Sequence, residues 1–457
     1  MKSKISKIHM VGIGGSGMSG IAEVLLSLGY EVTGSDWTQN DAVVRLQSLG
    51  AKVYLQHYPE NVGDAEVVVK STAIDADNPE VQEAGIKGVP VIPRAEMLAE
   101  LMRLKTGIAV AGTHGKTTTT SLLGTVFKEG GMDPTVIIGG KLNSYGSNAL
   151  MGQGDYLIAE ADESDGSFLC LLPIMSVVTN VDADHLDYYS DMREIEDSFV
   201  RFMNKLPFYG VNVVCGDDPN LRRLLSRVQR SVVTYGFNPD NDLQAEIYYS
   251  GLETKFRVFW NNAFWADIKI SLPGSHNVLN TLAVIGIALQ VGMSKQEILK
   301  GLKSFGGVGR RLEYKGERDG VPVFDDYGHH PQEVEVTLKT IKEMYPDKKL
   351  FVVFQPHRFS RTKALFGDFS KAFKRADKVL VTDVYPAGED PIPGINGFNL
   401  AQGIKQVSRV DADYCSDWES CLQVLNRDVR STDVLLTLGA GNVYKLGESL
   451  IQAAQRT

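Results

Sequence analysis

Residues 106–120, TGIAVAGTHGKTTTT, constrain the possible folds of this chain more than any other stretch. The apolar run from Gly107 to Ala111 predicts a buried strand, and the small residues 112–115 predict a tight turn after it. A helix is indicated next, because apolar residues recur at helical spacing at Leu122, Leu123, Val126 and Phe127. A strand, tight loop and helix in this order direct backbone N–H groups and a helix N-terminus at one point, which suits an anion.

The residues after the turn narrow this anion to a nucleotide phosphate. Lys116 supplies a positive charge for a terminal phosphate, and Thr117 supplies a hydroxyl for Mg²⁺. The match to G-x-x-x-x-G-K-[ST] is incomplete, because Val110 stands where that motif has its first glycine. The shorter pattern Gly112-x-x-Gly115-Lys116-Thr117 still favours ATP or GTP binding over a glycine-rich turn with a surface lysine.

Length and composition bound the remaining possibilities. A chain of 457 residues is too long for one core and predicts two to four domains. The net charge of −9 argues against a general nucleic-acid binder, and no apolar stretch is long enough to span a bilayer. Four cysteines without a metal-like C-x-x-C pair, and an N-terminus without a signal-like apolar region, predict a cytoplasmic protein with reduced thiols.

A second glycine-rich loop lies near the start of the chain. The predicted strand Lys7 to Val11 leads into residues 12–17, GIGGSG, which fit G-x-G-x-x-G, and a helix follows. A second strand, residues 30–33, ends near Asp36, at the fingerprint distance after the glycines. Such a loop holds any pyrophosphate and such an acid holds any ribose hydroxyl, so the ligand need not be NAD. The alternative is that the glycines only permit close packing of helix on strand.

Two further strands, residues 66–70 and 89–92, complete this first part. Ser71 directly follows the earlier of them, so it is expected at the carboxyl edge of the sheet, where ligands bind in such folds. A helix over residues 95–104 follows, and the charged turn 103–105 is the predicted end of the first domain.

Acidic residues follow the next buried strand, Tyr156 to Glu160. An acidic strand end beside a phosphate loop is where Mg²⁺ is expected, because oxygen ligands must bridge metal and phosphate. Glu160 is the predicted ligand, and the acids 161–165 otherwise read as a solvated loop. His185 follows a strand over residues 176–180; a lone histidine is more often structural, so the residues alone leave its role open.

The remainder of the middle part changes character. Alternating residues between 245 and 272 predict an antiparallel hairpin around Asn261-Asn262, and a helix then runs to Leu289. Asn277 and Asn280 share one face of that helix, where they either contact a nucleotide or serve as ordinary N-terminal turn residues. The glycine-rich stretch 306–309 predicts a flexible joint, followed by Arg310 and Arg311.

The last third again shows a parallel α/β pattern, with strands predicted at 321–325, 350–354, 378–382 and 434–438. Polar clusters follow all four strands and suggest one lined crevice at the same sheet edge. Arg358 and Arg361 are three residues apart and can act together on a carboxylate or phosphate. The alternative is that they are solvated charges at a helix start. Histidines are concentrated in or near these clusters, at His276, His329, His330 and His357.

Taken together, these segments resemble the Mur ligases, the ATP-dependent amide-forming enzymes of peptidoglycan synthesis. The resemblance covers essentially the whole chain and rests on HMVGIGGSGMSGIAEVL, GTHGKTTTT, EADESDGSF, NVDADHLDYY, GSHNVLN, GVGRRLEYKG, DDYGHHPQEV and FQPHRFSRT. It implies an α/β fold with three domains: a Rossmann-like domain for the UDP part (1–105), a central P-loop-type ATPase domain (106–308) and a C-terminal Rossmann-like α/β domain (309–457).

The resemblance also implies roles for individual residues. The implied ATP-binding residues are Gly112, Thr113, His114, Gly115, Lys116, Thr117, Thr118, Asn277, Asn280, Arg310 (or Arg311) and Asp326. The implied substrate-binding residues are Gly14, Ser16, Gly17, Asp36, Ser71, His329, Arg358 and Arg361. The implied Mg²⁺ ligands are Thr117, Glu160 and His185. His185 is assigned by the family likeness and not by its local chemistry.

Within the family, the chain most resembles the members that join L-alanine to the lactyl carboxylate of UDP-N-acetylmuramate through an acyl phosphate. Lys116 is then the predicted catalytic charge, and His329 or His357 the predicted general base for the amine. The expected partners are ATP, Mg²⁺ and these two substrates, with no nucleic acid or membrane, and the chain is expected as monomer or homodimer. A related ligase that recycles a tripeptide is a close alternative, but GGSGMSG and QPHRFSRT favour the alanine-adding members.

One departure from other family members concerns the metal. Several of them carry a carbamylated lysine on the helix after the DHLD motif, whereas residues 196–200 here are EDSFV and contain no lysine. A carbamate ligand is therefore not expected. Two readings of other classes remain: an NAD-linked dehydrogenase, suggested only by Gly12, Gly14 and Gly17, and a non-catalytic nucleotide switch.

Overall fold

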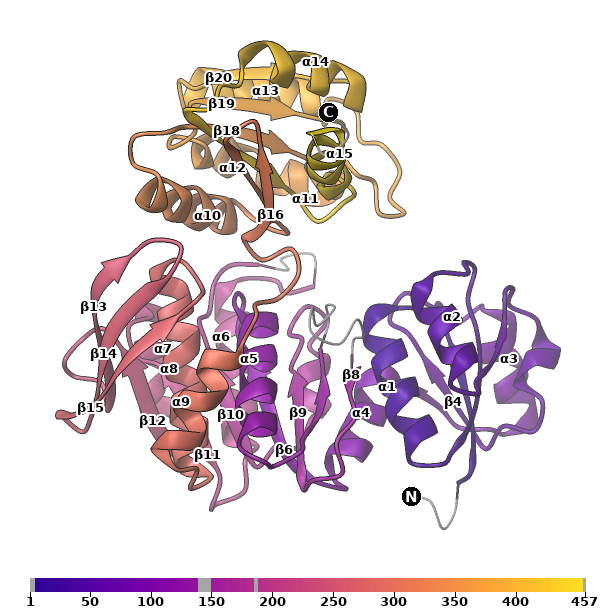
Figure 1. The fold of residues 1–457 in the computed structure, drawn as a ribbon. Coiled ribbons are helices and arrows are strands. Elements are labelled where there is room, and N and C mark those ends of the chain that lie inside the picture. The colour runs from indigo at the N-terminus through magenta and orange to yellow at the C-terminus, as the bar shows by residue number, and fades with distance from the viewer. Residues whose placement is uncertain (1–4, 139–148, 185–187, 455–457) are drawn as a thin grey trace. The chain divides into compact units, whose positions relative to one another are not determined.

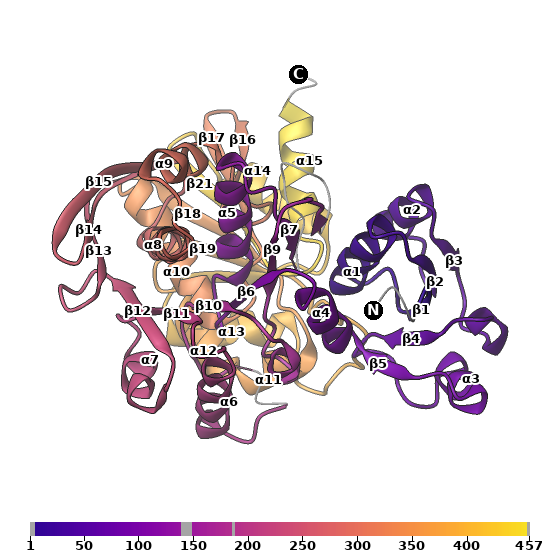
Figure 2. The same cartoon turned by 90° about the horizontal axis from the view of Figure 1, so that it is seen from below.

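The computed structural model describes residues 5–138, 149–184 and 188–454, and these form two compact units. The first comprises residues 1–248, 255–270 and 276–308, and the second comprises residues 309–457 with the short segments 249–254 and 271–275. Figures 1 and 2 show three sheets along the chain, coloured indigo, magenta to salmon, and orange to yellow. The first two sheets belong to the first unit and the third to the second, which confirms the predicted α/β class.

The N-terminal sheet is wholly parallel, with strand order β3-β2-β1-β4-β5. Its strands are β1 (Lys7–Val11), β2 (Glu31–Ser35), β3 (Lys52–Tyr54), β4 (Val67–Lys70) and β5 (Val91–Pro93). The helices are α1 (Ser16–Ser27), α2 (Asp41–Ser48), α3 (Pro79–Lys87) and α4 (Arg94–Met102), with a 3₁₀ turn η1 (Pro59–Val62). β2 runs two residues beyond its predicted end, because parallel pairing with β1 continues to Val11 opposite Ser35.

The central sheet has ten strands in the order β15-β14-β13-β12-β11-β10-β6-β9-β7-β8. They are β6 (Thr106–Ala111), β7 (Thr135–Ile137), β8 (Ala149–Leu150), β9 (Tyr156–Glu160), β10 (Met175–Val178), β11 (Val211–Cys215), β12 (Ser231–Gly236), β13 (Leu243–Ser250), β14 (Thr254–Trp260) and β15 (Ala263–Ile270). Its helices are α5 (Lys116–Glu129), α6 (Met192–Asn204), α7 (Pro219–Leu224), α8 (Ser275–Gln290) and α9 (Lys295–Ser304), with 3₁₀ turns η2 (Ser167–Cys170) and η3 (Leu225–Arg227). The predicted hairpin is β14–β15, where Asn261 and Asn262 take φ of 48° and 62°, as a two-residue type I′ turn requires.

The C-terminal sheet has the order β16-β17-β21-β18-β19-β20. Its strands are β16 (Glu313–Arg318), β17 (Val321–Asp326), β18 (Lys349–Phe354), β19 (Lys378–Val381), β20 (Asp411–Tyr414) and β21 (Asp433–Leu438). Its helices are α10 (Pro331–Met344), α11 (Phe359–Ala364), α12 (Phe366–Ala372), α13 (Gly397–Val407), α14 (Trp418–Asp428) and α15 (Tyr444–Ala454).

The four predicted strands pair parallel, as β17, β21, β18 and β19. One edge departs from this pattern, because β16 runs antiparallel to β17. The sequence prediction also missed both edge strands, β16 and β20. Their residues, EYKGER and DADY, are too charged to read as strands, and backbone pairing with a neighbour decides their conformation. Strands β3, β7, β8, β11 and β12 likewise have no counterpart in the prediction.

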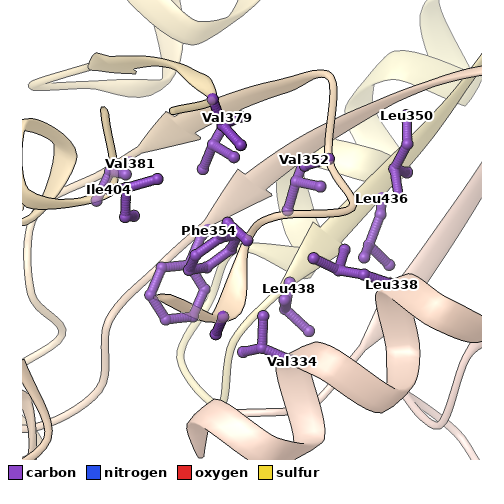
Figure 3. Close-up of a cluster of buried hydrophobic side chains, with 14 of the residues drawn as sticks. Val334, Leu338, Leu350, Val352, Phe354, Val379, Val381, Ile404, Leu436 and Leu438 are labelled. Carbon is purple, nitrogen blue, oxygen red and sulfur yellow. The ribbon is translucent and has the colours of Figure 1, made fainter. Parts of the chain in front are cut away.

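Both faces of the C-terminal sheet are covered, which explains why its central strands are continuously apolar. In β18, Leu350, Val352 and Phe354 point into one buried cluster, while Phe351 and Val353 point into the other. Figure 3 shows the first cluster, formed with α10 and α13 and with β19 and β21. No helix in the described part of the chain is both long and apolar enough to cross a membrane.

Replacement of Phe354 tests the contribution of this core to stability. Its side chain is 0% exposed, and its ring centroid lies 5.5 Å from that of Phe369 and 5.1 Å from that of Phe373. We expect Phe354→Ala to lower the free energy of unfolding of the C-terminal unit by about 3–5 kcal/mol, because it leaves a cavity. Urea denaturation measures the loss. Phe398→Ala, which removes a ring that is 52% exposed, is the matched control and should change stability by less than about 1 kcal/mol; equal losses would contradict the core assignment.

Candidate active site

The predicted phosphate loop links β6 to α5 and is held by the end of β10. Its glycines need conformations that other residues rarely adopt, with φ of 127° at Gly112 and 83° at Gly115. A Cβ on Gly112 would lie 2.1 Å from Thr179 Oγ1, so the loop approaches β10 too closely for any side chain. Asn180 fixes the loop from the same side: its carbonyl accepts from Thr113 N at 3.1 Å and its side chain accepts from His114 N at 2.8 Å.

Lys116 is the first residue of α5, and its ammonium is turned back over the loop. Nζ donates to the carbonyl oxygens of Gly112 at 2.7 Å and Thr113 at 3.1 Å, and to both carboxylate oxygens of Glu163 at 2.9 and 2.8 Å. Burial lowers the pKa of Lys116, but the attraction of Glu163 and Asp162 outweighs it, so the pKa is raised. The ammonium is therefore charged and sits where an anion is expected.

The acidic end of β9 is divided between two tasks. Glu163 is the buried partner of Lys116, a role that the sequence did not single out. Glu160, the predicted metal ligand, is the last residue of β9, and its charge also raises the pKa of Lys116, so it lies within electrostatic reach of the loop. Thr117 and Thr118 occupy the first turn of α5 beside Lys116. His185 lies outside the described residues.

Helix α8 supplies the asparagine pair. Asn277 and Asn280 are both 6% exposed, and Asn280 Nδ2 donates to Asn277 Oδ1 at 3.2 Å. Asn280 also lies against the phosphate loop, since a Cβ on Gly115 would be 2.8 Å from its Oδ1. The structure therefore brings this pair to the loop, although the two segments are 165 residues apart in the sequence.

The N-terminal glycine loop follows β1 and is held by β2. Gly12 N and Ile13 N donate to the carbonyl of Ser35 at 2.9 and 3.0 Å, and Gly14 N donates to Asp36 Oδ2 at 2.8 Å. Ser71 lies beside the loop, because a Cβ on Gly12 would be 3.1 Å from its own Cβ. Ser16 and Gly17 open α1. The predicted residues of the first domain therefore gather at one sheet edge.

A buried polar cluster beneath this loop was missed by the sequence analysis. Ser35 Oγ and His57 Nδ1 contact Glu80 Oε2, and Asn61 Nδ2 donates to Glu80 Oε1 at 2.6 Å. Burial raises the pKa of Glu80, but hydrogen bonds from His9, Ser35 and Asn61 outweigh it, so the pKa is lowered. This carboxylate therefore supports Ser35, whose carbonyl holds the loop. The partners come from separate segments, and a glutamate after Pro79 reads only as a helix-start acid, so the sequence carried no signal for the cluster.

In the C-terminal unit, Arg310 is bound entirely within its own unit. Nε donates to Asp325 Oδ2 at 2.9 Å, and the two terminal nitrogens donate to the carbonyls of Gly441 and Gly439. The guanidinium also lies 5.0 Å from the ring centroid of Tyr327 and 4.6 Å from that of Tyr444. Arg310, one of the two adjacent arginines implied for ATP, therefore holds this sheet edge together. The Arg311 guanidinium lies 5.3 Å from the centroid of the Tyr327 ring.

Asp326 ends β17 and binds backbone. Its oxygens accept from Leu312 N at 2.7 Å and Gly328 N at 2.8 Å. Burial raises its pKa to about 6, although Arg311 and these hydrogen bonds act in the opposite direction. Asp326 thus fixes the turn that carries His329.

Two predicted histidines come together at the ends of β17 and β18. The ring centroids of His329 and His357 are 5.9 Å apart, and His357 stacks on Tyr385 at 5.5 Å. Arg361 Nη1 lies 3.4 Å from His357 Nδ1, and Arg358 Nε lies 3.7 Å from Glu389 Oε1. Burial lowers the pKa of both histidines to about 4, so both are neutral near pH 7. The charge of Arg361 adds to this lowering, whereas Glu333 opposes it at His329 and Glu389 opposes it at His357.

Family profiles match the three parts of the chain one by one. The family profile described as "Mur ligase family, catalytic domain" matches residues 7–106, "Mur ligase middle domain" matches 110–288, and "Mur ligase, glutamate ligase domain" matches 310–441. A protein of Nitratidesulfovibrio vulgaris (strain DP4) named UDP-N-acetylmuramate–L-alanine ligase is 60% identical over 451 residues, covering 99% of each chain. A protein of Geobacter sp. (strain M21) with the same name is 53% identical, covering 99% of this chain and 98% of the other.

Solved structures show the same likeness. The crystal structure of UDP-N-acetylmuramate-alanine ligase from Thermotoga maritima superposes with a TM-score of 0.82 at 31% identity, covering 98% of this chain and 99% of the other. The MurF ligase of Thermotoga maritima in complex with ADP shares the fold, with a TM-score of 0.65 at 18% identity and coverage of 93% and 95%.

The paired histidines predict a pH dependence with a defined sign. A histidine whose pKa falls from about 6.5 unfolded to about 4 folded contributes stability above pH 6.5 that is lost as the pH falls toward 4. Asp326, raised from 3.8 to about 6, acts in the opposite direction and contributes stability only as the pH falls below 6. We therefore expect His329→Asn to flatten the acid loss of stability, by up to about 3 kcal/mol, and Asp326→Asn to steepen it.

Urea unfolding between pH 7 and 4.5 measures both slopes. Nuclear magnetic resonance of labelled histidine should show the His329 and His357 rings unprotonated down to about pH 5, whereas the urea-unfolded chain titrates near 6.5. Titration of both rings near 6.5 in the folded protein would contradict the assignment.

Proposed function

This chain belongs to the Mur ligase family, and we infer that it joins L-alanine to the lactyl carboxylate of UDP-N-acetylmuramate at the expense of ATP, in peptidoglycan precursor synthesis. The observation that carries the inference is the full-length identity of 60% with relatives that bear this ligase's name. We propose the domain limits 1–105, 106–308 and 309–457 for the nucleotide-sugar, ATP and C-terminal domains, and a cytoplasmic site of action, where ATP is available.

The reaction divides into two transfers. The lactyl carboxylate attacks the γ-phosphorus of ATP, the bond to the β-phosphate oxygen breaks, and ADP leaves. The neutral amine of L-alanine then attacks the acyl carbon, an amide forms, and phosphate leaves with its electron pair while the amine loses a proton. The first transfer concentrates negative charge on the moving phosphoryl group, so a fixed positive charge at that point lowers its barrier.

Lys116 is the proposed source of that charge. In the structure, the ammonium of Lys116 binds both carboxylate oxygens of Glu163, each at less than 3 Å. Two oxygens of a phosphate group can take the place of these two negatively charged oxygens. ATP therefore replaces Glu163 as the partner of Lys116. We propose that the loop Gly112-Thr113-His114-Gly115 and the first turn of α5 with Thr117 and Thr118 complete the phosphate site. The N–H groups of Thr113 and His114 are bonded to Asn180 in the structure, so these two residues serve by fixing the shape of the loop. Asn277 and Asn280 are proposed to face the nucleotide.

Mg²⁺ fits the oxygen donors at this loop. Glu160 is a carboxylate at the end of β9 within electrostatic reach of Lys116, and Thr117 offers a hydroxyl one residue further along α5. The residues that the structure describes form no ready-made group of three or more His, Cys, Asp or Glu ligands, which suits an ion that takes most of its ligands from phosphate and water. Glu160, Thr117 and His185 are the proposed protein ligands, and the ion would neutralise phosphate charge.

In the C-terminal unit, the neutral pair of His329 and His357 is proposed to receive the amine of L-alanine. A base with a pKa of about 4 is weak, but the negative charge of an acyl phosphate raises the pKa of a nearby imidazole toward the working pH. Arg358 and Arg361 are proposed to bind the carboxylate of L-alanine.

We propose that Asp326 contributes to nucleotide binding through the turn that it fixes. Because the guanidinium of Arg310 donates to Asp325 and to two backbone carbonyls of its own unit, we assign the phosphate contact of this segment to Arg311.

A phosphate-release assay tests the function. Purified protein with ATP and Mg²⁺ receives UDP-N-acetylmuramate and L-alanine separately and together. Release should require both substrates and yield one phosphate per amide formed. Release with ATP alone would favour a nucleotide switch and contradict the ligase, and binding of NAD without phosphate release would favour the dehydrogenase.

Lys116→Ala is the sharpest variant for the phosphate assignment. We expect kcat to fall by at least about 100-fold, the size seen when one group that stabilises transition-state charge is removed. Lys128→Ala, which removes the same charge from the other end of α5, is the matched control and should retain wild-type turnover. Turnover of the Lys116 variant within tenfold of wild type would remove this lysine from the reaction.

A further inference from the structure

Arg94 lies against the N-terminal glycine loop, residues 12–17, although the two are far apart in the sequence. β5 ends at Pro93 and α4 begins at Arg94, so this side chain stands at the carboxyl edge of the sheet. A Cβ built on Gly17 would lie 2.1 Å from Arg94 Nη1 and 3.0 Å from its Cζ. The guanidinium therefore rests on the first turn of α1, in the space that a side chain at Gly17 would fill. The third glycine of the motif makes room for this arginine.

The strand order explains why an arginine at this point can meet a ligand. In the order β3-β2-β1-β4-β5 the chain reverses direction of winding between β1 and β4, and ligands bind outside the carboxyl ends at such a point. Asp36 follows β2, Ser71 follows β4 and Arg94 follows β5, while the glycine loop follows β1 between them. Three side chains from three strand ends thus surround the loop.

Charge distinguishes the two sides of this site. Asp36 lies on one side, where its carboxylate accepts from Gly14 N. Arg94 lies on the other side, beside the N-terminus of α1, whose free N–H groups already favour negative charge. A planar guanidinium binds phosphate oxygens through two parallel hydrogen bonds, which neither a backbone N–H nor a lysine provides.

We propose that Arg94 binds the diphosphate of the nucleotide sugar and that Gly17 is glycine to admit its guanidinium. The inference rests on the proposed function, which supplies UDP-N-acetylmuramate as the ligand, and it adds a specific residue to that site. The carboxylate of Asp36 then faces the ribose, and the guanidinium of Arg94 faces the diphosphate. The two opposite charges therefore set the direction in which the nucleotide lies.

The neighbourhood of Arg94 also fits this orientation. Arg94 Nη2 lies 3.8 Å from Asp162 Oδ2, and Asp162 follows β9 of the central sheet. Arg94 thus stands on the side of the loop nearer the ATP-binding residues. A diphosphate held there sends the sugar and its lactyl carboxylate toward the γ-phosphate.

Calorimetric titration tests the proposal. Full-length wild type and Arg94→Ala, each with a non-hydrolysable ATP analogue and Mg²⁺, are titrated with UDP-N-acetylmuramate, UDP and uridine. Arg94→Ala loses a charge-assisted bond to the diphosphate, so it should raise Kd for UDP-N-acetylmuramate and for UDP by roughly 10- to 100-fold. Its Kd for uridine, which has no phosphate, should stay within about twofold of the wild-type value. Arg94→Lys should recover part of the affinity, because it keeps the charge without the fork.

Two further variants separate this role from a general effect. Arg103→Ala removes the same charge at the end of α4, where Arg103 pairs with Glu100, and should bind all three ligands as wild type does. Gly17→Ala should lose diphosphate affinity without losing stability, because alanine favours helix over glycine. In the Arg94→Ala background, Gly17→Ala should have little further effect.

Each outcome decides one point. Wild-type affinity of Arg94→Ala for UDP-N-acetylmuramate would overturn the Arg94 proposal alone and leave the ligase function standing. An equal loss for uridine, or additive losses for Arg94 and Gly17, would also overturn it. Failure of the wild-type protein to bind UDP-N-acetylmuramate would instead overturn the proposed function, and the Arg94 inference with it.

Discussion

The buried ammonium of Lys116 is the constraint on which the central site depends. A charge removed from water must be paired and hydrogen-bonded, and Lys116 meets this requirement with two loop carbonyls and the carboxylate of Glu163. The carbonyls of Gly112 and Thr113 can point at Nζ only if the loop turns as tightly as it does, which explains the positive φ at Gly112 and Gly115. The loop is therefore already shaped around a cation–anion pair, which is the arrangement that the proposed phosphate contact requires.

The same physical arrangement recurs in all three sheets. The charged and polar side chains of each candidate site follow the carboxyl ends of parallel strands. Neighbouring strands bring those ends to one edge of the sheet. At the N-terminal sheet this edge holds the glycine loop, at the central sheet Lys116 with Glu163, and at the C-terminal sheet the histidine pair. Beneath each edge a buried carboxylate bonded to its surroundings fixes the backbone: Glu80 through Ser35, Glu163 through Lys116, and Asp325 through Arg310. Buried carboxylates therefore support each site, in addition to the apolar core of its sheet.

Charge burial also sets the chemistry that the C-terminal residues can perform. His329 and His357 are neutral because their rings are buried and close to Arg361. Neutral imidazoles accept a proton or hydrogen bond at pH 7 and do not repel an arriving ammonium. Arg310, by contrast, donates to Asp325 and to two backbone carbonyls, so its charge supports the sheet edge. Two adjacent arginines in the sequence therefore have different tasks.

The sequence by itself determined the α/β class, the strand–loop–helix at Lys116, the glycine loop before α1 and the β14–β15 hairpin, because each follows from local spacing and turn chemistry. It did not determine the edge strands β16 and β20, whose conformation comes from pairing with a neighbour. Only the tertiary structure decided that Glu163 pairs with Lys116, that Glu80 supports the first loop and that Arg94 lies on Gly17. These contacts join segments far apart in the chain, and their strength depends on burial and distance, neither of which is written in the order of the residues.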